Sequence, residues 1–447
     1  MKNLIQKITL VFLFCSVFAQ AGFDLAPKHP WFLTLHNLKE KEPYALEMTE
    51  RLITDQGLFL YMSYLPYSNW ERYLHSHDMA DQPAWHGYLL AAYAFKEAVT
   101  GEDFDDKMEI LADGFLKHYE VTGQPGLIAR SLIPDYTGPR LPWMDTPQNN
   151  PTKFWMQGPT GAWFRNGIAK GHVNMAAFGC SIPLALERKG QIQLRDTTRA
   201  KLISVLLPLV QRLERNDLYI MDWNGRPTEF GNLGPQVLNG FNMMLVLHML
   251  KAASWYDPYL AKRYQKYMKS WHWRINWSLN LLGRATRGII GDDHGTENRP
   301  SISDMQHLSL AYLSLYLQGG DRRKYMKHIY RGMYGIWNFM RYMRNPMFTI
   351  PYYATVRGDE YTRMQEVIED LRDFPLEKYE TSEGGVITKF IQPLANRPFD
   401  TNYWKSSPFL AITKYPPPRT GQEQVFSSVD YLLAYWMGRY FGVIPEE

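Results

Sequence analysis

The stretch WHGYLLAAYAFKEAVTG (residues 85–101), followed by FDDKMEILADGFLKHYEVTG (residues 104–123), decides the fold class of this chain. In each part, apolar residues recur every three or four positions, which is the period of an amphipathic helix. The apolar positions are Trp85, Leu89, Ala92, Phe95 and Val99 in the first part, and Met108, Leu111, Phe115 and Tyr119 in the second. Both parts end in Val-Thr-Gly, and a glycine just past such a pattern is a helix stop signal. The stretch therefore predicts one antiparallel pair of helices.

Similar helical patterns recur along the chain, and the strict alternation typical of strands is almost absent. Further helices are expected at residues 42–64, 170–187, 197–214, 237–256, 260–282, 304–317, 321–342, 361–372 and 429–440. The pairs at 237–282 and 304–342 resemble loose repeats of each other. An open solenoid would have short, regular repeats, whereas the inserts between these pairs are long and varied. We therefore predict an all-α fold, an (α/α)6-type toroid of helical hairpins with long loops lining one face.

Residues 124–161 form the longest connection in the first half of the chain, and it contains seven prolines. Loops of this length inside a compact domain are usually functional or disordered. The Trp and Tyr residues of this segment argue against disorder, so we expect an ordered lid or cleft wall. Further along, Asn224-Gly225 is the signal of a tight hairpin.

The first 21 residues are expected to be a secretory signal peptide rather than part of the fold. Lys2 and Lys7 precede the apolar run 8–18, and Ala19-Gln20-Ala21 fits a small-residue cleavage site. Residues 22–447 are then expected to form one domain, exported to the periplasm or the extracellular space. No later stretch is apolar enough for a membrane span.

Charge and cysteine content argue against several classes of partner and site. Removal of Lys2 and Lys7 lowers the formal net charge from +4 to +2, which argues against a dedicated nucleic-acid-binding protein. Of the two cysteines, only Cys180 follows the expected cleavage site, so an intramolecular disulfide and a thiolate metal site are both excluded. The sequence makes no prediction of the oligomeric state.

Several short motifs resemble those of a group of secreted bacterial proteins that have no assigned activity. They are WHGYL (85–89), AVTG (98–101), GLIARS (126–131), Gly171-His172, DWNGRPT (222–228) and VDYLLAYWMGRY (429–440). This group is similar to the six-hairpin glycosidase-like superfamily, so the resemblance implies an (α/α) toroid and carbohydrate chemistry. One departure stands out, because the resemblance leads us to expect an acidic residue before Gly171-His172 and residues 165–170 contain none.

The densest group of polar residues lies in the loop at residues 291–300 and in the helix start that follows it. It holds Asp292, Asp293, His294 and Asn298, with Asp304 in the first turn of the helix. Asp and Asn also favour turns and helix caps, which is the alternative interpretation. The functional interpretation places these side chains against a substrate.

A glycoside hydrolase is the first prediction for the activity, with a polysaccharide or cell-envelope glycan as substrate. Hydrolysis of a glycosidic bond requires one protonated carboxyl group and one carboxylate. Asp292, Asp293 and Asp304 are candidates, and Asp135 of the long connection is another. Asp222 precedes Asn224-Gly225, and we favour a turn role for it.

A polysaccharide lyase is the second prediction, and a non-catalytic glycan-binding or surface protein is the third. A lyase uses Tyr or His to remove a proton beside a uronate and Arg, Asn or His to neutralise the carboxylate. Tyr136, His172, His294, Arg130 and Asn298 have the required chemistry. His86 and His172 lie near predicted helix starts, although a histidine among apolar residues is more often a hydrogen-bonded core residue.

Three tryptophans are further candidates for substrate contact. Trp143, Trp155 and Trp163 lie outside the clear helical periodicity, so they could stack on sugar rings or simply anchor the connection. No nucleotide or phosphate-binding motif occurs, and His75-Ser76-His77-Asp78 lacks standard metal-ligand spacing. We therefore expect neither a metal nor another cofactor.

Overall fold

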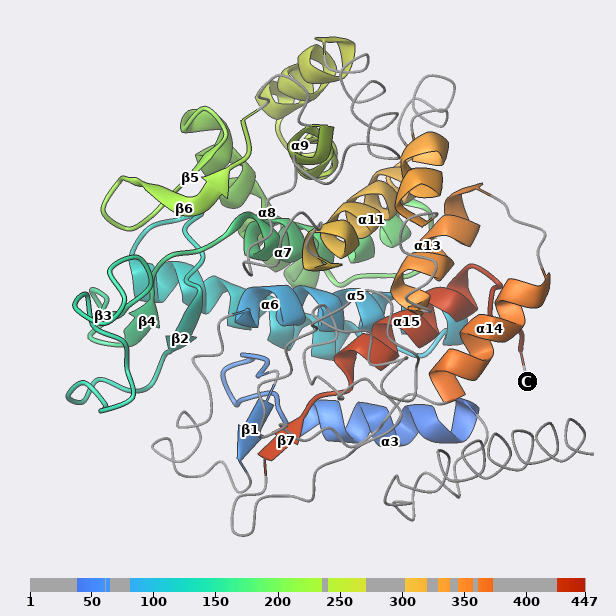
Figure 1. The fold of residues 1–447 in the computed structure, drawn as a ribbon, viewed down its shortest axis with the longest axis horizontal. Helices are drawn as coiled ribbons and strands as arrows, with labels where there is room; N and C mark the ends of the chain where they lie inside the picture. Colours follow the sequence, from blue (N-terminus) through green and yellow to red (C-terminus); the bar gives the residue numbers. More distant parts are fainter. Residues whose placement is uncertain are drawn as a thin grey trace, which may run out of the picture.

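The computed structural model describes residues 38–60, 62–64, 81–234, 240–270, 302–319, 329–337, 345–356, 361–372 and 424–446. The described part is mostly helical, which confirms the predicted all-α class (Figure 1). The helices are α3 (Leu38–Glu50), α5 (Gln82–Thr100), α6 (Asp105–Thr122), α7 (Lys170–Arg188), α8 (Asp196–Arg215), α9 (Gly240–Ala253), α11 (Ile302–Leu317), α13 (Pro346–Val356), α14 (Tyr361–Arg372) and α15 (Val429–Tyr440). Residues 258–270 and 329–337 are also helical.

Within the described residues, seven short strands form three small sheets. The strands are β1 (Met62–Tyr64), β2 (Ser131–Ile133), β3 (Trp155–Gln157), β4 (Trp163–Arg165), β5 (Tyr219–Met221), β6 (Pro227–Asn232) and β7 (Gln424–Phe426). All described strand pairs are antiparallel: β1 with β7, β4 between β2 and β3, and β5 with β6. The β5–β6 pair is the hairpin that Asn224-Gly225 predicts, and Gly225 has the positive φ of 73° that its turn requires.

The helical pair predicted from the opening stretch is confirmed as α5 and α6. Both helices stop at a glycine in the left-handed conformation, Gly101 with φ 71° and Gly123 with φ 66°. The amide of Gly101 donates to the carbonyl of Glu97 at 2.8 Å and so closes the last turn of α5.

Two expectations about individual elements are wrong. The helix expected over residues 42–64 ends at Glu50, and a turn with an isolated bridge between Ile53 and Phe59 follows. Gly57 in this turn has φ 76° and lies so close to α6 that an added Cβ would stand 1.9 Å from the carbonyl oxygen of Ile110. Helix α13 was not expected, since it contains Pro346 at its start and Pro351 inside.

Helices α5 and α7 pack with their backbones in direct contact. A Cβ added to Gly87 would lie 2.0 Å from the carbonyl oxygen of Met175, and one added to Gly179 would lie 2.5 Å from the Cα of Gly87. Side chains near the starts of the two helices also meet, since His172 contacts Asp81. The two helices therefore run in the same direction, with α6 as the antiparallel helix between them in sequence.

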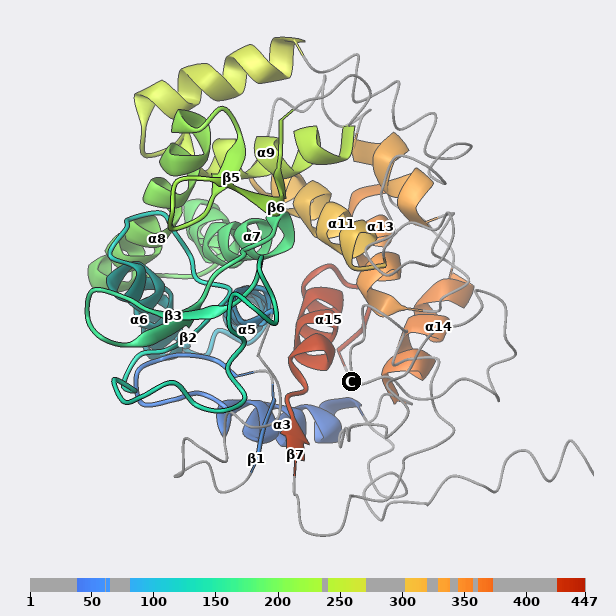
Figure 2. The ribbon, with the colours of Figure 1, turned by 60° about the vertical axis from the view of Figure 1, so that its left-hand side comes forward.

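The odd-numbered helices from α5 to α15 pack on one another in sequence order. Each packs on the next, and α15 packs on α5. Figure 2 shows α5, α7, α11 and α15 between α6 and α8 along one edge and α14 along the opposite edge. Within the described residues, no helix is both long and apolar enough to cross a bilayer.

Helix α3 joins the beginning of the described chain to its end through buried charges. The ammonium group of Lys41 donates to the last carbonyls of α14, those of Leu371 at 2.9 Å and Arg372 at 2.6 Å. The carboxylate of Glu42 accepts from Lys96 of α5 at 3.0 Å and from the indole of Trp436 of α15 at 2.9 Å. A cation near a helix carboxyl end is favourable because it offsets the unsatisfied carbonyl groups there.

The long connection between α6 and α7 is ordered and lies against the amino-terminal ends of α5 and α7. It forms the three-stranded sheet of β2, β4 and β3. The amide of Leu132 in β2 donates to the side-chain oxygen of Gln82, the first residue of α5, at 3.1 Å. The order of this connection agrees with the expectation from its Trp and Tyr content.

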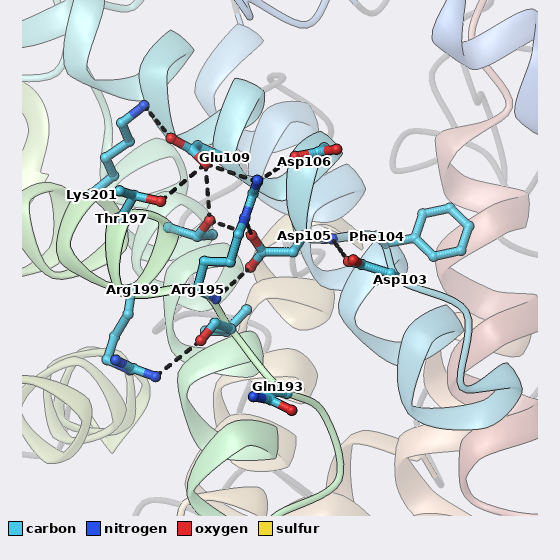
Figure 3. A network of polar contacts seen from close by, with 12 residues as sticks. Asp103, Phe104, Asp105, Asp106, Glu109, Gln193, Arg195, Thr197, Arg199 and Lys201 are labelled. Carbon is cyan, nitrogen blue, oxygen red and sulfur yellow. Dashed lines mark hydrogen bonds and ion pairs between the residues drawn. The ribbon is translucent and has the colours of Figure 1, made fainter.

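A charged network fastens the starts of α6 and α8 together (Figure 3). Asp105 is 1% exposed and accepts hydrogen bonds from the amide of Arg195 at 3.1 Å, from the hydroxyl of Thr198 at 2.7 Å and from the guanidinium of Arg195. Glu109 accepts from Arg195 at 2.9 Å and from Lys201 at 2.8 Å. The buried carboxylate therefore joins two helices that are about 90 residues apart in sequence.

Replacing Asp105 with alanine is expected to lower the free energy of unfolding by about 2–4 kcal/mol, because the buried hydroxyl of Thr198 and the amide of Arg195 lose their acceptor. Asp106→Ala is the matched control, since this neighbour is 82% exposed and its contact with Arg195 is a surface ion pair worth about 1 kcal/mol or less. Urea denaturation of both variants measures the difference. Equal losses in the two would contradict this role of Asp105.

Candidate functional site

Three helix starts bring ionisable side chains together beside the β2–β4–β3 sheet. Asp81 is the residue before α5, His172 lies in the first turn of α7, and His307 lies near the start of α11. Arg130 joins them from the residue before β2. We refer to Asp81, Arg130, His172 and His307 as the helix-start cluster.

The contact between Asp81 and His172 is the shortest in the cluster. The Nε2 of His172 lies 2.6 Å from the Oδ1 of Asp81, and its Nδ1 accepts the amide of Ala169 at 2.9 Å. The neutral imidazole therefore carries its hydrogen on Nε2 and donates a hydrogen bond to the carboxylate of Asp81. Because both ring nitrogens are engaged, His172 holds Asp81 in place and also caps the start of α7.

Arg130 contributes the positive charge of the cluster. One terminal nitrogen of its guanidinium lies 3.8 Å from the Oδ1 of Asp81, and the other donates to the carbonyl of Gly167 at 3.1 Å. The carboxylate of Asp222 supports the same loop, because it accepts from the amide of Gly167 and the side chain of Asn166, both at 3.3 Å. The backbone of Asp222 lies in the predicted turn, where its carbonyl accepts from the amide of Gly225 at 3.0 Å, and the support that its side chain gives to this distant loop was not expected.

The two carboxyl groups have opposite pKa shifts. Burial acts to raise the pKa of Asp81, but the hydrogen bond from His172 and the positive charge of Arg130 outweigh it, so the pKa lies well below the usual value. Burial raises the pKa of Asp222 despite its hydrogen bonds. Asp81 is therefore an ionised carboxylate at neutral pH, and 36% of its side chain is exposed.

A buried polar network connects the helices behind the cluster. The side chain of Asn174 on α7 donates to the carbonyl of His307 at 3.4 Å, and its oxygen lies 2.6 Å from the Nε2 of His248 on α9. The other nitrogen of His248 lies 3.3 Å from the hydroxyl of Ser314 on α11. Burial lowers the pKa of His248 to about 3, so this histidine is neutral.

The candidate residues predicted from the sequence lie in different parts of the structure. His172 and Arg130 belong to the helix-start cluster. Asp292, Asp293, His294 and Asn298 lie outside the described residues. The backbone of Asp304 lies on α11, one turn before His307, and its side chain is outside the description.

His86 and Asp135 lie apart from the cluster contacts. His86 is fully buried, its Nε2 pairs with the carbonyl of Leu111 at 2.7 Å, and burial lowers its pKa to about 3. This is the core histidine that the alternative interpretation describes. Asp135 is half-exposed and accepts a hydrogen bond from Gln56.

The aromatic candidates anchor the connection between α6 and α7. The hydroxyl of Tyr136 donates to the carbonyl of Pro139 at 2.8 Å, and the indole of Trp163 donates to the carbonyl of Gly138 at 2.9 Å. Trp143 and Trp155 pack edge to face, with ring centroids 5.5 Å apart. Trp155 is 1% exposed and Trp163 is 6% exposed, so neither presents an open face for stacking.

Sequence reasoning missed Asp81 and His307 as site residues. Asp81 directly precedes Gln82-Pro83, and a proline at a helix start marks Asp81 as the N-cap position. Its carboxylate makes no cap hydrogen bond and is directed to His172 instead. His307 lies among apolar residues of a helix and carries no local signal.

Comparisons with protein-family models, with curated proteins and with solved structures gave no match. In the part of the chain that the structure describes, no group of three His, Cys, Asp or Glu residues could hold a metal ion.

The lowered pKa of Asp81 predicts a pH effect on stability. A carboxyl group with a lower pKa in the folded state stabilises the protein above its unfolded pKa of about 4, and this contribution is lost as the pH falls toward the folded value. Asp81→Asn should therefore flatten the decline in unfolding free energy below about pH 4. Urea denaturation at several pH values tests this, with Asp106→Asn as the control. An unchanged acid slope in Asp81→Asn would contradict the ion pairing.

Proposed function

We propose that the odd-numbered helices α5 to α15 close into the inner ring of an (α/α)6-type toroid. The support is their packing order, in which each contacts the next and α15 contacts α5. The helix-start cluster and the β2–β4–β3 sheet would then lie at one mouth of the ring. Polar side chains from separate turns meet there, as a binding site in this fold class requires.

We propose that the protein is an exported carbohydrate-active enzyme that hydrolyses glycosidic bonds. The observation that supports this most is the ionised carboxylate of Asp81, held by His172 and Arg130 and partly exposed at the helix starts. Such a carboxylate can act as the nucleophile or activate a water molecule. Asp304, one helical turn before His307, is the candidate for the protonated partner.

The geometry favours hydrolysis over elimination by a lyase. A lyase base must be free and basic enough to accept a proton, whereas the ring nitrogens of His172 contact Asp81 and Ala169 and the hydroxyl of Tyr136 is bound to Pro139. Burial lowers the pKa of His307 to about 3, so this histidine is a weak base. Arg130 would neutralise a uronate carboxylate, but it already lies beside Asp81. Its positive charge therefore supports a protein carboxylate rather than that of a substrate.

A panel of neutral and uronate-containing polysaccharides tests the proposed activity. We expect new reducing ends with a neutral substrate and no ultraviolet absorbance from an unsaturated product. Asp81→Asn should lower kcat by at least about 100-fold, because the substitution removes the negative charge and keeps the shape. Asp106→Asn, on the exposed face of α6, should leave the rate unchanged.

Two results would contradict the hydrolase proposal. Formation of an unsaturated product would indicate a lyase. Binding of a glycan with no turnover by the wild-type protein would indicate a non-catalytic glycan-binding protein.

A further inference from the structure

Two of the described histidines, His118 and His307, have no hydrogen-bond partner at either ring nitrogen, whereas His86, His172 and His248 each have one. His118 is 0% exposed in the core beside Phe115, and His307 is the one that belongs to the helix-start cluster. The imidazole of His307 is 7% exposed, and neither of its nitrogens has a hydrogen-bond partner among the described residues. A buried donor or acceptor that lacks a hydrogen bond lowers the stability of the folded state, so such a group calls for an explanation.

The backbone of α7 is shaped to receive this ring. A Cβ added to Gly171 would lie 2.4 Å from the Cε1 and 2.9 Å from the Nδ1 of His307. Any other residue at position 171 would therefore displace the imidazole. Because Gly171 directly precedes His172, the ring of His307 lies beside the Asp81–His172 pair.

The protonation state of His307 limits what it can bind. Burial lowers the pKa of His307 to about 3, and the charge of Lys170 acts in the same direction while that of Asp81 opposes it. The neutral ring offers one N–H donor and one acceptor nitrogen. A carboxylate ligand accepts only, and it would face the acceptor nitrogen as well as the negative charge of Asp81. A sugar hydroxyl can both donate and accept.

We propose that His307 is a substrate-binding residue that recognises hydroxyl groups of a neutral sugar unit, next to the carboxylate of Asp81. This inference rests on the proposed glycosidase function and adds the class of substrate. Gly171 provides the space for the imidazole, and Asn174 holds the backbone of His307. Uronate units are disfavoured at this position.

Binding measurements with the wild-type protein test the substrate class while the charge of Asp81 is present, and thio-linked probes prevent turnover. The probes are hexasaccharides of glucose, xylose and mannose, with oligogalacturonate as the anionic comparison, followed by isothermal titration calorimetry. We expect at least one neutral probe to bind more tightly than oligogalacturonate. His307→Ala should weaken that binding at least tenfold, whereas His307→Gln should keep most of it, because an amide also has a donor and an acceptor.

Gly171→Ala provides a second variant that leaves the histidine in the sequence. It should weaken binding of the neutral probe by displacing the imidazole, and the thermal unfolding midpoint of each variant shows whether the fold is retained. Unchanged binding in folded His307→Ala, or tighter binding of oligogalacturonate than of every neutral probe, would overturn the proposal.

The wild-type enzyme separates this inference from the proposed hydrolysis. If neutral probes bind through His307 but no glycan is cleaved, the hydrolase proposal fails and this inference stands. If a glycan is cleaved and His307→Ala leaves both KM and kcat unchanged, the inference fails and the hydrolase proposal stands.

Discussion

The close contact between α5 and α7 is the constraint on which the candidate site depends. Gly87 and Gly179 let the two backbones touch with no side chain between them. Because the helices run in the same direction, this contact places their starts side by side and brings Asp81 to within 2.6 Å of His172. Gly171 likewise leaves space for the imidazole of His307 on α11, because it has no side chain. Three glycines thus determine how closely three helix starts approach one another.

The electrostatics of the cluster follow from this arrangement. The carboxylate in contact with His172 comes from Asp81, at the start of the neighbouring helix α5. His172 and Arg130 keep Asp81 ionised, whereas burial raises the pKa of Asp222, which accepts hydrogen bonds from the loop beside Arg130. The shifts assign separate roles to the two carboxyl groups: Asp81 faces solvent and is suited to chemistry, and Asp222 supports the loop.

Local patterns in the sequence predicted the helices well and the site only in part. Apolar periodicity and the stops at Gly101 and Gly123 were sufficient for α5 and α6, because helices depend on neighbours three and four residues away. The pairing of Asp81 with His172 spans 91 residues and has no local signal. His172 and Arg130 were named from their chemistry, but the role of His172 in holding Asp81 required the packing of α5 on α7. The roles of the tryptophans in the long connection could not be predicted either, because composition does not distinguish a residue that anchors a loop from one that stacks on a sugar ring.

The free energy of unfolding of Gly87→Ala tests the central contact most directly. An added methyl group would lie 2.0 Å from the carbonyl oxygen of Met175, so α5 and α7 would have to separate, and we expect a loss of at least about 1–3 kcal/mol. Gly335→Ala is the matched control, because a Cβ on this helical glycine meets no atom within 4 Å, and it should leave stability unchanged or raise it by up to about 1 kcal/mol. Equal stability of the two variants in urea denaturation would contradict the account.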